Sequence, residues 1–448
     1  MGALTVSLRR NCTLQRVHNC THGLIASYAN LFWCSRLSLS AKSRYAFNPI
    51  EEDDLLAENL AKHGQKILKL NRGDPGAYFP MPPTLRESFV SAIQEGKTSY
   101  TSSRGVPELV KAVTEKCRKK YGLEVDEESV VITQGVSEAL QFINLASIDE
   151  GDHAVLFRPH FPIYTPLLEL AGGRPSFLDY DESADWNLDI DELDRHIRAL
   201  KALKKVKYLL ITNPNNPTGT VLTKKVLEEV VELAVEHNLI LVSDEIYDEV
   251  VYKGTEFTSV AQVADGVPYV LLGGASKAFL ATGLRIGYTI IPNHDSLSEN
   301  LKRKIYEIAT LRVCANTPSQ YAVAAAMNAH AEHEREIAKL VDQIQDRSDF
   351  ALKLLRENEH LQTVRPQGAF YLFPRVNLNT LGFKSDKEFV ETLLKEERVQ
   401  LTRGSGFGSP GHVRIVSLAP KEVLSEAIGR LNKFCAGRSK PRMPNARG

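Results

Sequence analysis

The feature that most constrains this 448-residue chain is an alternation of short β-rich runs with helical segments from about residue 66 to residue 436. Apolar residues recur at helical spacing between the runs, for example in Val136–Ala146 and Lys224–His237. Such alternation favours an α/β fold with a mostly parallel sheet and helices on both faces. We predict strands at Ser129–Thr133, His153–Phe157, Lys207–Thr212, Leu239–Ser243 and Tyr269–Leu272.

The chain changes character after about Thr317. Two amphipathic helices are predicted at Ser319–Glu332 and Glu334–Glu357, and short strands near Ala369–Arg375 and His412–Ser417. We interpret this region as a smaller α+β domain. The predicted division is a basic leader over 1–45, an N-terminal part of the small domain over 46–83, a large domain over 84–317, the rest of the small domain over 318–436, and a disordered tail over 437–448.

Composition excludes several classes of protein. The chain is 43% hydrophobic and 25% charged, which is typical of a globular protein and not of a disordered or coiled-coil chain. It has 55 basic and 55 acidic residues, so no overall positive field attracts nucleic acid. Without an apolar run of about 18 residues, no membrane-spanning helix is expected. No Cys-x-x-Cys pair or zinc-type spacing occurs, so we predict no metal and free, reduced cysteines.

The first 50 residues carry six basic side chains and no acidic one. An acid-free start with Arg and Ser is typical of an organelle transit peptide. A start codon assigned too early and an unstructured extension are the alternatives. We expect a cytoplasmic protein. If the leader is a transit peptide, the location would instead be mitochondrial or in another organelle.

Polar residues follow the predicted strands at the edge where open parallel sheets bind ligands. The first run ends in a glycine turn at Gly135, and a helix opens with Val136 and Ser137. Free N–H groups at such a helix start favour a phosphate, although a glycine turn alone is weak evidence. The third run leads into Asn213–Gly219, where two prolines fix the loop and Asn216 can offer its amide to a ligand.

Two further strand ends carry ionisable groups. Asp244 directly follows a buried run and precedes Tyr247, so it is either a helix cap or a functional carboxylate. Lys277 lies among small residues after another buried run, with Arg285 eight residues on. A desolvated lysine has a lowered pKa and can form a Schiff base. A phosphate cradle, an amide, a carboxylate, a phenol and a lysine together match the needs of pyridoxal 5′-phosphate (PLP).

Longer segments around these residues resemble the class I/II PLP-dependent aminotransferases of fold type I. The similarity covers about residues 45 to 435 in the family's order. Arg312–Ala322 and Leu70–Pro75 are most similar to alanine-type members. The segments that carry the resemblance are Asn213–Gly219 (NPNNPTG), Ser243–Tyr247 (SDEIY), Ser276–Tyr288 (SKAFLATGLRIGY), Gln367–Pro374 (QGAFYLFP) and Gly404–Ser417 (GSGFGSPGHVRIVS).

The resemblance implies the chemical role of four residues. Lys277 would form the Schiff base with the cofactor and then move a proton between the substrate's α-carbon and the cofactor. Asp244 would pair with the cofactor's pyridine nitrogen and keep it protonated, which lets the ring withdraw electrons. Tyr247 and Asn216 would hydrogen-bond the 3′-oxygen of the ring.

The resemblance also implies how the cofactor and substrate are held. The large domain would bind the cofactor. Arg414 would clamp the substrate's α-carboxylate, with the Gly73 backbone and Asn216 beside it. Phe161 would stack on the pyridine ring, and Tyr100 would reach the phosphate of a neighbouring subunit, which implies a homodimer. The phosphate would be held within each subunit by Gly135, Val136, Ser137, Ser276 and Arg285.

The resemblance implies exchange of an amino group between an amino acid and a 2-oxo acid, with alanine and 2-oxoglutarate as the preferred pair. An aromatic or other aminotransferase and a cysteine-conjugate β-lyase are the alternatives within the fold. A PLP-fold transcriptional regulator is an alternative of another class, but the leader is too short for a DNA-binding head. Arg312 is a candidate for binding a second substrate carboxylate, and a structural ion pair is the equal alternative.

Overall fold

The structure is a computed structural model that describes residues 39–264 and 266–438. The predictions for most of the leader and for most of the C-terminal tail fall outside the described residues, as do three of the six cysteines. The chain divides into two compact units, Met1–Arg44 and Tyr45–Gly448. A short 3-10 helix, η1 (Ala41–Tyr45), spans the point in the sequence where the two units meet.

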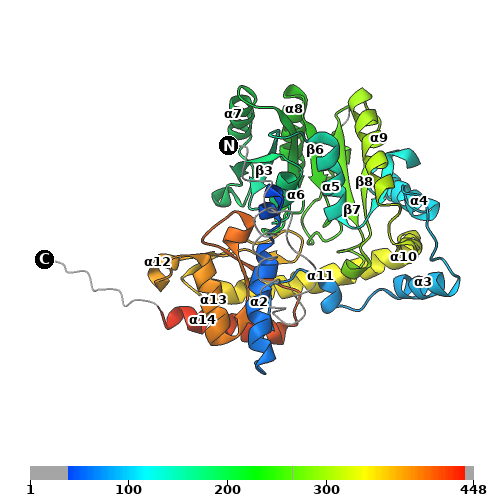
Figure 1. Ribbon diagram of the computed structural model, residues 1–448. Helices are drawn as coiled ribbons and strands as arrows, with labels where there is room; N and C mark the ends of the chain where they lie inside the picture. Colours follow the sequence, from blue (N-terminus) through cyan, green and yellow to red (C-terminus); the bar gives the residue numbers. More distant parts are fainter. Residues whose placement is uncertain (1–38, 265, 439–448) are drawn as a thin grey trace, which may run out of the picture. The chain divides into compact units, whose positions relative to one another are not determined.

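Within the described residues, the largest sheet has seven strands in the order β2-β8-β7-β6-β5-β3-β4 (Figure 1). Strand β8 is antiparallel to both of its neighbours, and the other pairs are parallel. All strands except β8 therefore run in one direction, and their carboxyl ends lie at one edge. The strands are β2 (Val130–Thr133), β3 (His153–Arg158), β4 (Arg174–Asp179), β5 (Val206–Thr212), β6 (Ile240–Asp244), β7 (Tyr269–Gly274) and β8 (Gly287–Ile290).

Helices cover both faces of this sheet, as predicted, because apolar residues continue along each strand on alternating sides. On β2, for example, Val131 packs in one buried cluster while Val130 and Ile132 pack in the opposite one. The first cluster contains α5 (Val136–Ser147), α6 (Tyr164–Leu170) and α9 (Ser296–Leu311). The second contains α4 (Pro107–Lys116), α7 (Ile190–Lys201), α8 (Lys224–Glu236) and α10 (Thr317–Asn328), and α3 (Pro83–Gln94) packs on α10.

A separate apolar core lies in the C-terminal part of the chain. It joins the end of α11 (His330–Arg356) to α13 (Asp386–Glu397) and α14 (Lys421–Ala436). Three small sheets belong to this part, with orders β1-β12, β10-β14-β13 and β11-β9. Their strands are β1 (Leu68–Lys69), β9 (Leu361–Gln362), β10 (Tyr371–Leu372), β11 (Arg375–Val376), β12 (Val399–Gln400), β13 (Thr402–Arg403) and β14 (Val413–Val416), with α12 (Leu378–Leu381) between β11 and α13. The domain boundaries themselves stay a prediction.

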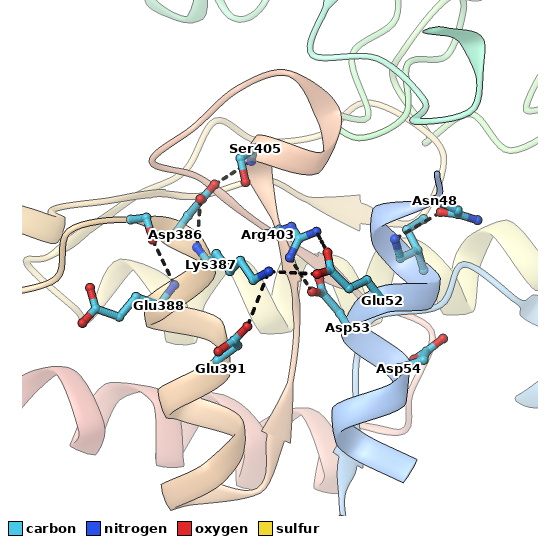
Figure 2. A network of polar contacts seen from close by, with 12 residues as sticks. Asn48, Glu52, Asp53, Asp54, Asp386, Lys387, Glu388, Glu391, Arg403 and Ser405 are labelled. Carbon is cyan, nitrogen blue, oxygen red and sulfur yellow. Dashed lines mark hydrogen bonds and ion pairs between the residues drawn. The ribbon is translucent and has the colours of Figure 1, made fainter. Parts of the chain in front are cut away.

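Ion pairs hold α2 (Pro49–Lys62) against this C-terminal part (Figure 2). Arg403 of β13 contacts both Glu52 and Asp53, and its Nη1 lies 3.0 Å from Asp53 Oδ1. Lys387 of α13 donates to Glu52 over 2.9 Å. The Asn48 side chain caps the start of α2 by accepting from the N–H of Ile50. The first turn of α2 is therefore fixed in position.

Four local predictions need correction. The break between the two long helices lies at Ala329, not near residue 333. Helix α10 also begins earlier than predicted, at Thr317, because Asn316 caps it by accepting from Ser319 N–H. Strands β4 and β8 were not predicted. Strand β4 is an edge strand whose sequence, RPSFLD, contains a proline, and β8 is only four residues long.

Candidate active site

A cleft of about 530 Å³ lies beyond the carboxyl ends of the parallel strands. A larger hollow, about 1140 Å³, is lined by Trp186 and Arg375 but by none of the predicted site residues. The smaller cleft is therefore the candidate active site, because the predicted site residues line it. The predicted residues that line it are Gly73, Val136, Ser137, Phe161, Asn216, Asp244, Tyr247, Ser276, Lys277, Arg285 and Arg414.

Glycines allow one end of the cleft to close tightly around Arg285. Gly135 has φ +78°, and a Cβ there would lie 2.3 Å from Arg285 Nη2. A Cβ on Gly287 would lie 2.6 Å from the Gly135 carbonyl carbon. Helix α5 begins at Val136, so the N–H groups of its first turn and the positive end of its dipole meet the guanidinium. This combination favours an anion such as a phosphate.

Lys277 follows β7 and is the amine at the centre of the cleft. Its Nζ donates to the Gly73 carbonyl over 2.7 Å. The pKa of Lys277 is lowered from 10.5 to about 8, chiefly by burial and also by repulsion from Arg414 and Arg285, while Asp74 and Asp244 act in the opposite direction. A large fraction of this amine is therefore neutral near pH 8 and can act as a nucleophile or a base.

Asp244 ends β6 and is buried without an ion-pair partner among the described residues. Its Oδ2 accepts from the Tyr164 hydroxyl over 2.6 Å, and its Oδ1 accepts from Ile246 N–H over 3.2 Å. Burial nevertheless raises its pKa from 3.8 to about 6. A cation bound beside Asp244 would compensate the buried charge and lower this pKa.

Arg414 of β14 is buried and is prepared to bind an anion. Its Nη1 donates to Asn216 Oδ1 over 2.9 Å and its Nη2 to the Asn71 carbonyl over 2.6 Å. The rings of Tyr371 and Phe407 each lie 4.6 Å from the guanidinium carbon. Its buried Nε has no partner in the described part of the chain. A carboxylate would satisfy this charge and the free N–H.

Tyr247 and Tyr371 form one wall of the cleft, with their hydroxyl oxygens 2.7 Å apart. Burial raises the pKa of both hydroxyls, so both keep their protons at neutral pH. Residue 73 passes so close to this wall that a Cβ there would lie 2.1 Å from Tyr371 Oη. Only glycine leaves the backbone of residue 73 open to the cleft in this conformation.

Of three other predicted residues, one lies in the cleft and two do not line it. Phe161 lies in the cleft, edge-on to Tyr164 with ring centroids 5.7 Å apart. Tyr100 is 85% exposed and does not line the cleft, so its role toward a partner subunit stays a prediction. Arg312 also lies outside the cleft lining, and its Nη2 donates to the Ile132 carbonyl over 2.7 Å and its Nε lies 3.4 Å from Glu138. These contacts favour the structural interpretation of Arg312.

Sequence reasoning did not identify Tyr164, Tyr371 or Asn71 as parts of the site. Tyr164 is the first residue of α6 and lies three residues after Phe161, which precedes the helix. Tyr371 is within the QGAFYLFP segment and Asn71 within LNRGDP. The motifs therefore contained these residues, but the hydrogen bonds that they make join distant parts of the chain.

Comparison with known proteins gives the class of this fold and site. The family described as aminotransferase class I and II matches residues 65–431, so the chain belongs to that family. It is a PLP-dependent aminotransferase with the type I fold of that family.

The chain is 32% identical to a glutamate-pyruvate aminotransferase of Haemophilus influenzae, over 86% of this chain and 94% of that protein. It is 33% identical to an aspartate aminotransferase of Thermotoga maritima, over 86% and 96%. Among solved structures, an alanine aminotransferase from Pyrococcus furiosus has a TM-score of 0.82 and 36% identity, over 90% of this chain and all of that one. An aspartate aminotransferase from Thermus thermophilus with maleate has a TM-score of 0.81 and 30% identity, over 89% and 100%.

The residues present fit the cofactor that this family uses. The buried Asp244 carboxylate lacks a cation, the Gly135 turn forms a cradle that a Cβ would fill, and the Lys277 amine is buried with a lowered pKa. Three described cysteines, Cys117, Cys314 and Cys435, are free, in agreement with the prediction for them. No helix among the described residues is long and apolar enough to cross a membrane.

Proposed function

We propose that this aminotransferase exchanges the amino group between alanine and 2-oxoglutarate. The observation that supports the chemistry best is the convergence of three buried groups in one cleft: the Lys277 amine, the Asp244 carboxylate and the Arg414 guanidinium. No two of these groups are neighbours in sequence, and each is far less common in a protein interior than at the surface. Their joint burial indicates a reaction centre.

Bound PLP would supply a carbonyl group for the amine to join and an electron-withdrawing ring. Lys277, once released as a neutral amine, would remove the proton from the substrate's α-carbon and return it to the cofactor's reactive carbon. Asp244 would stay ionised and hold a proton on the ring nitrogen, while Tyr164 keeps the carboxylate in orientation. Each proton transfer occurs within one complex, which makes it effectively intramolecular.

Other residues of the cleft would hold the cofactor and substrate in this geometry. Arg414 would bind the α-carboxylate through its two-pronged guanidinium, beside the Gly73 backbone. Phe161 would stack on the ring, and Tyr247 and Asn216 would donate to its 3′-oxygen. The phosphate would be held by the α5 N-terminus at Gly135, Val136 and Ser137, together with Ser276 and Arg285.

The substrate pair rests on the relatives and on the charge of the cleft. Relatives near 30% identity are named both for alanine or pyruvate and for aspartate. The cleft is small, and its buried cation for a substrate, Arg414, is suited to the α-carboxylate that all amino acids share. A small neutral amino acid needs no second charged partner, which favours alanine as the donor.

Half-reactions test this proposal directly. Purified protein loaded with PLP would be mixed with one amino acid at a time, and the cofactor's absorbance would be followed. We expect the highest kcat/KM for alanine and glutamate, with aspartate and phenylalanine at least about tenfold lower. A preference for phenylalanine would indicate an aromatic aminotransferase, and thiol release from cysteine conjugates would indicate a β-lyase. Either result would overturn the alanine assignment.

Three further assignments belong to this proposal. We infer a homodimer in which the exposed Tyr100 completes the partner subunit's phosphate site. In a mixed dimer of Tyr100→Phe and Lys277→Ala chains, one site would then combine Lys277 with an unchanged Tyr100, and the other site would carry both substitutions. Normal PLP affinity and activity should return at the first site, whereas a Tyr100 that acts within its own chain would leave one weakened and one inactive site. The division into a large cofactor-binding domain (84–317) and a small domain (46–83 with 318–436), and a cytoplasmic location, are likewise inferred from the sequence.

A further inference from the structure

Among the described residues, four cationic side chains line the cleft: Arg72, Lys277, Arg285 and Arg414. The proposed function uses three of them, for the cofactor carbonyl, the phosphate and the α-carboxylate. Arg72 has no task in that scheme, although it directly precedes Gly73 in the chain. It is 55% exposed, so its guanidinium can be reached from the cleft.

One edge of Arg72 is held rigidly by Asp54 of α2. Arg72 Nε donates to Asp54 Oδ2 over 2.7 Å. The other oxygen of Asp54 accepts from Asn71 Nδ2 over 2.7 Å and from Gln400 Nε2 over 2.6 Å. Asp54 is 7% exposed, so this carboxylate is a fixed anchor that orients the arginine.

Arg72 Nη2, which also lies 2.5 Å from Asp54 Oδ2, makes a second contact with Glu51, and this contact is of a different kind. Both carboxylate oxygens of Glu51 lie 3.1 Å from Arg72 Nη2. Glu51 is 62% exposed and makes its one side-chain contact within the described residues here. The Nη1 of Arg72 has no partner in the described part of the chain. An exposed ion pair of this type contributes at most about 1 kcal/mol, so Glu51 can leave at little cost.

The four acids at the start of α2 thus have three different roles. Glu52 and Asp53 are bound by Arg403 and fix α2 to the C-terminal part (Figure 2). Asp54 anchors Arg72. Glu51 alone lines the cleft and has no fixed partner other than the exposed guanidinium. It occupies the place that a carboxylate from solution would take.

We propose that Arg72 binds the second carboxylate of glutamate and 2-oxoglutarate, and that Glu51 is the internal carboxylate that this group displaces. The inference rests on the proposed function and names the acidic half of its substrate pair. With alanine or pyruvate bound, the Glu51–Arg72 pair stays closed and no cation is left unpaired beside a methyl group. With glutamate bound, the substrate's distal carboxylate replaces Glu51, which returns to water. One cleft thereby accepts a neutral and an acidic substrate in turn.

The test compares both half-reactions in Arg72→Gln, Arg72→Lys and Glu51→Gln variants. Loss of a charge-assisted hydrogen bond predicts that Arg72→Gln raises the KM for glutamate and 2-oxoglutarate about 10- to 100-fold. The KM for alanine and pyruvate should change less than about threefold. Arg72→Lys should recover part of the loss, because it keeps the charge but not the planar fork. Glu51→Gln should lower the KM for glutamate about two- to fivefold, because it removes the competitor.

A binding measurement separates recognition from catalysis. Glutarate and butyrate have similar length, but only glutarate has a second carboxylate. Titration of the PLP-loaded protein, followed by cofactor absorbance, should show that Arg72→Gln weakens glutarate about tenfold or more and leaves butyrate unchanged. Arg118→Gln is the matched control, because it breaks an exposed ion pair with Glu115 that does not line the cleft. It should change neither ligand.

Equal effects of Arg72→Gln on glutarate and butyrate, or no effect on either, would overturn the inference and leave Arg72 as a structural link between α2 and β1. A Glu51→Gln variant that binds glutarate more weakly would also overturn it. These outcomes differ from failure of the proposed function. In that case the wild-type protein itself would not transaminate alanine with 2-oxoglutarate, whatever the variants bind.

Discussion

Replacing Asp244 with Asn should stabilise the cofactor-free protein near neutral pH while it slows transamination. Burial raises the pKa of Asp244 from 3.8 to about 6, so the folded protein binds this proton more tightly than the unfolded chain does. The contribution that the protonated Asp244 carboxyl makes to folding stability is complete below pH 3.8 and is lost as the pH rises through about 6. A pKa shift of this size lowers the free energy of unfolding by about 3 kcal/mol at pH 7.5 and by roughly half of that at pH 5.

An asparagine can remove the charge without leaving an unpaired group. The amide oxygen of residue 244 could accept from Ile246 N–H as the carboxylate does. Its NH₂ group could donate to the Tyr164 oxygen, and the Tyr164 hydroxyl could donate to Thr212 Oγ1, which lies 2.9 Å away. Because the hydrogen bonds can be kept, the loss of the buried charge should dominate the change in stability.

Urea unfolding of cofactor-free wild type and Asp244→Asn, followed by circular dichroism at pH 5 and pH 7.5, measures this effect. We expect the variant to be more stable by about 3 kcal/mol at pH 7.5 and by about 1.5 kcal/mol at pH 5. Asp149→Asn, at an exposed carboxylate, should change stability by less than about 0.5 kcal/mol. A gain that is the same at both pH values, or a loss at pH 7.5, would refute the reasoning. With PLP bound, turnover of Asp244→Asn should fall by orders of magnitude.

Lys277→Ala should abolish the change in cofactor absorbance on adding amino acids and lower turnover at least about 10⁴-fold, because the neutral amine is both nucleophile and base. A remaining absorbance change in rapid-mixing spectra would show that another lysine serves instead. Asp248→Asn should lower the free energy of unfolding by about 3 kcal/mol in urea, because it removes a buried carboxylate 2.9 Å from Lys116; an unchanged midpoint would contradict this. Gly73→Ala should raise the KM of every amino acid substrate in steady-state kinetics, because its Cβ would lie 2.1 Å from Tyr371 Oη. A change in kcat alone, with KM unchanged, would contradict this prediction.

The parts of the fold that could be predicted are those that local sequence controls. Each long parallel strand has its own apolar run, and the polar group that follows it must lie at the carboxyl edge of the sheet. Lys277 after β7 and Asp244 at the end of β6 were therefore predictable without any tertiary contact. Their positions in one cleft follow from the common direction of the strands.

Other features depend on contacts between distant segments. The reversal of β8 is set by its position between β2 and β7, and its four residues carry no signal of direction. The hydrogen bond from Tyr164 to Asp244 joins residues 80 positions apart. A buried tyrosine has the same appearance in sequence whether it fills space or orients a carboxylate. Only the tertiary structure separates these two roles.

Substrate choice was the least predictable property, and the acidic start of α2 shows the physical reason. Glu51, Glu52, Asp53 and Asp54 are consecutive and chemically similar, yet the fold holds three of them in buried or networked contacts and leaves Glu51 in one exposed ion pair. Specificity in the proposed scheme depends on which carboxylate is weakly held beside Arg72, and so on a difference between two competing ion pairs. Such a difference can change through a single substitution without altering the motifs for the cofactor. Relatives named for alanine and for aspartate match this chain at 32% and 33% identity, so overall identity does not give the substrate.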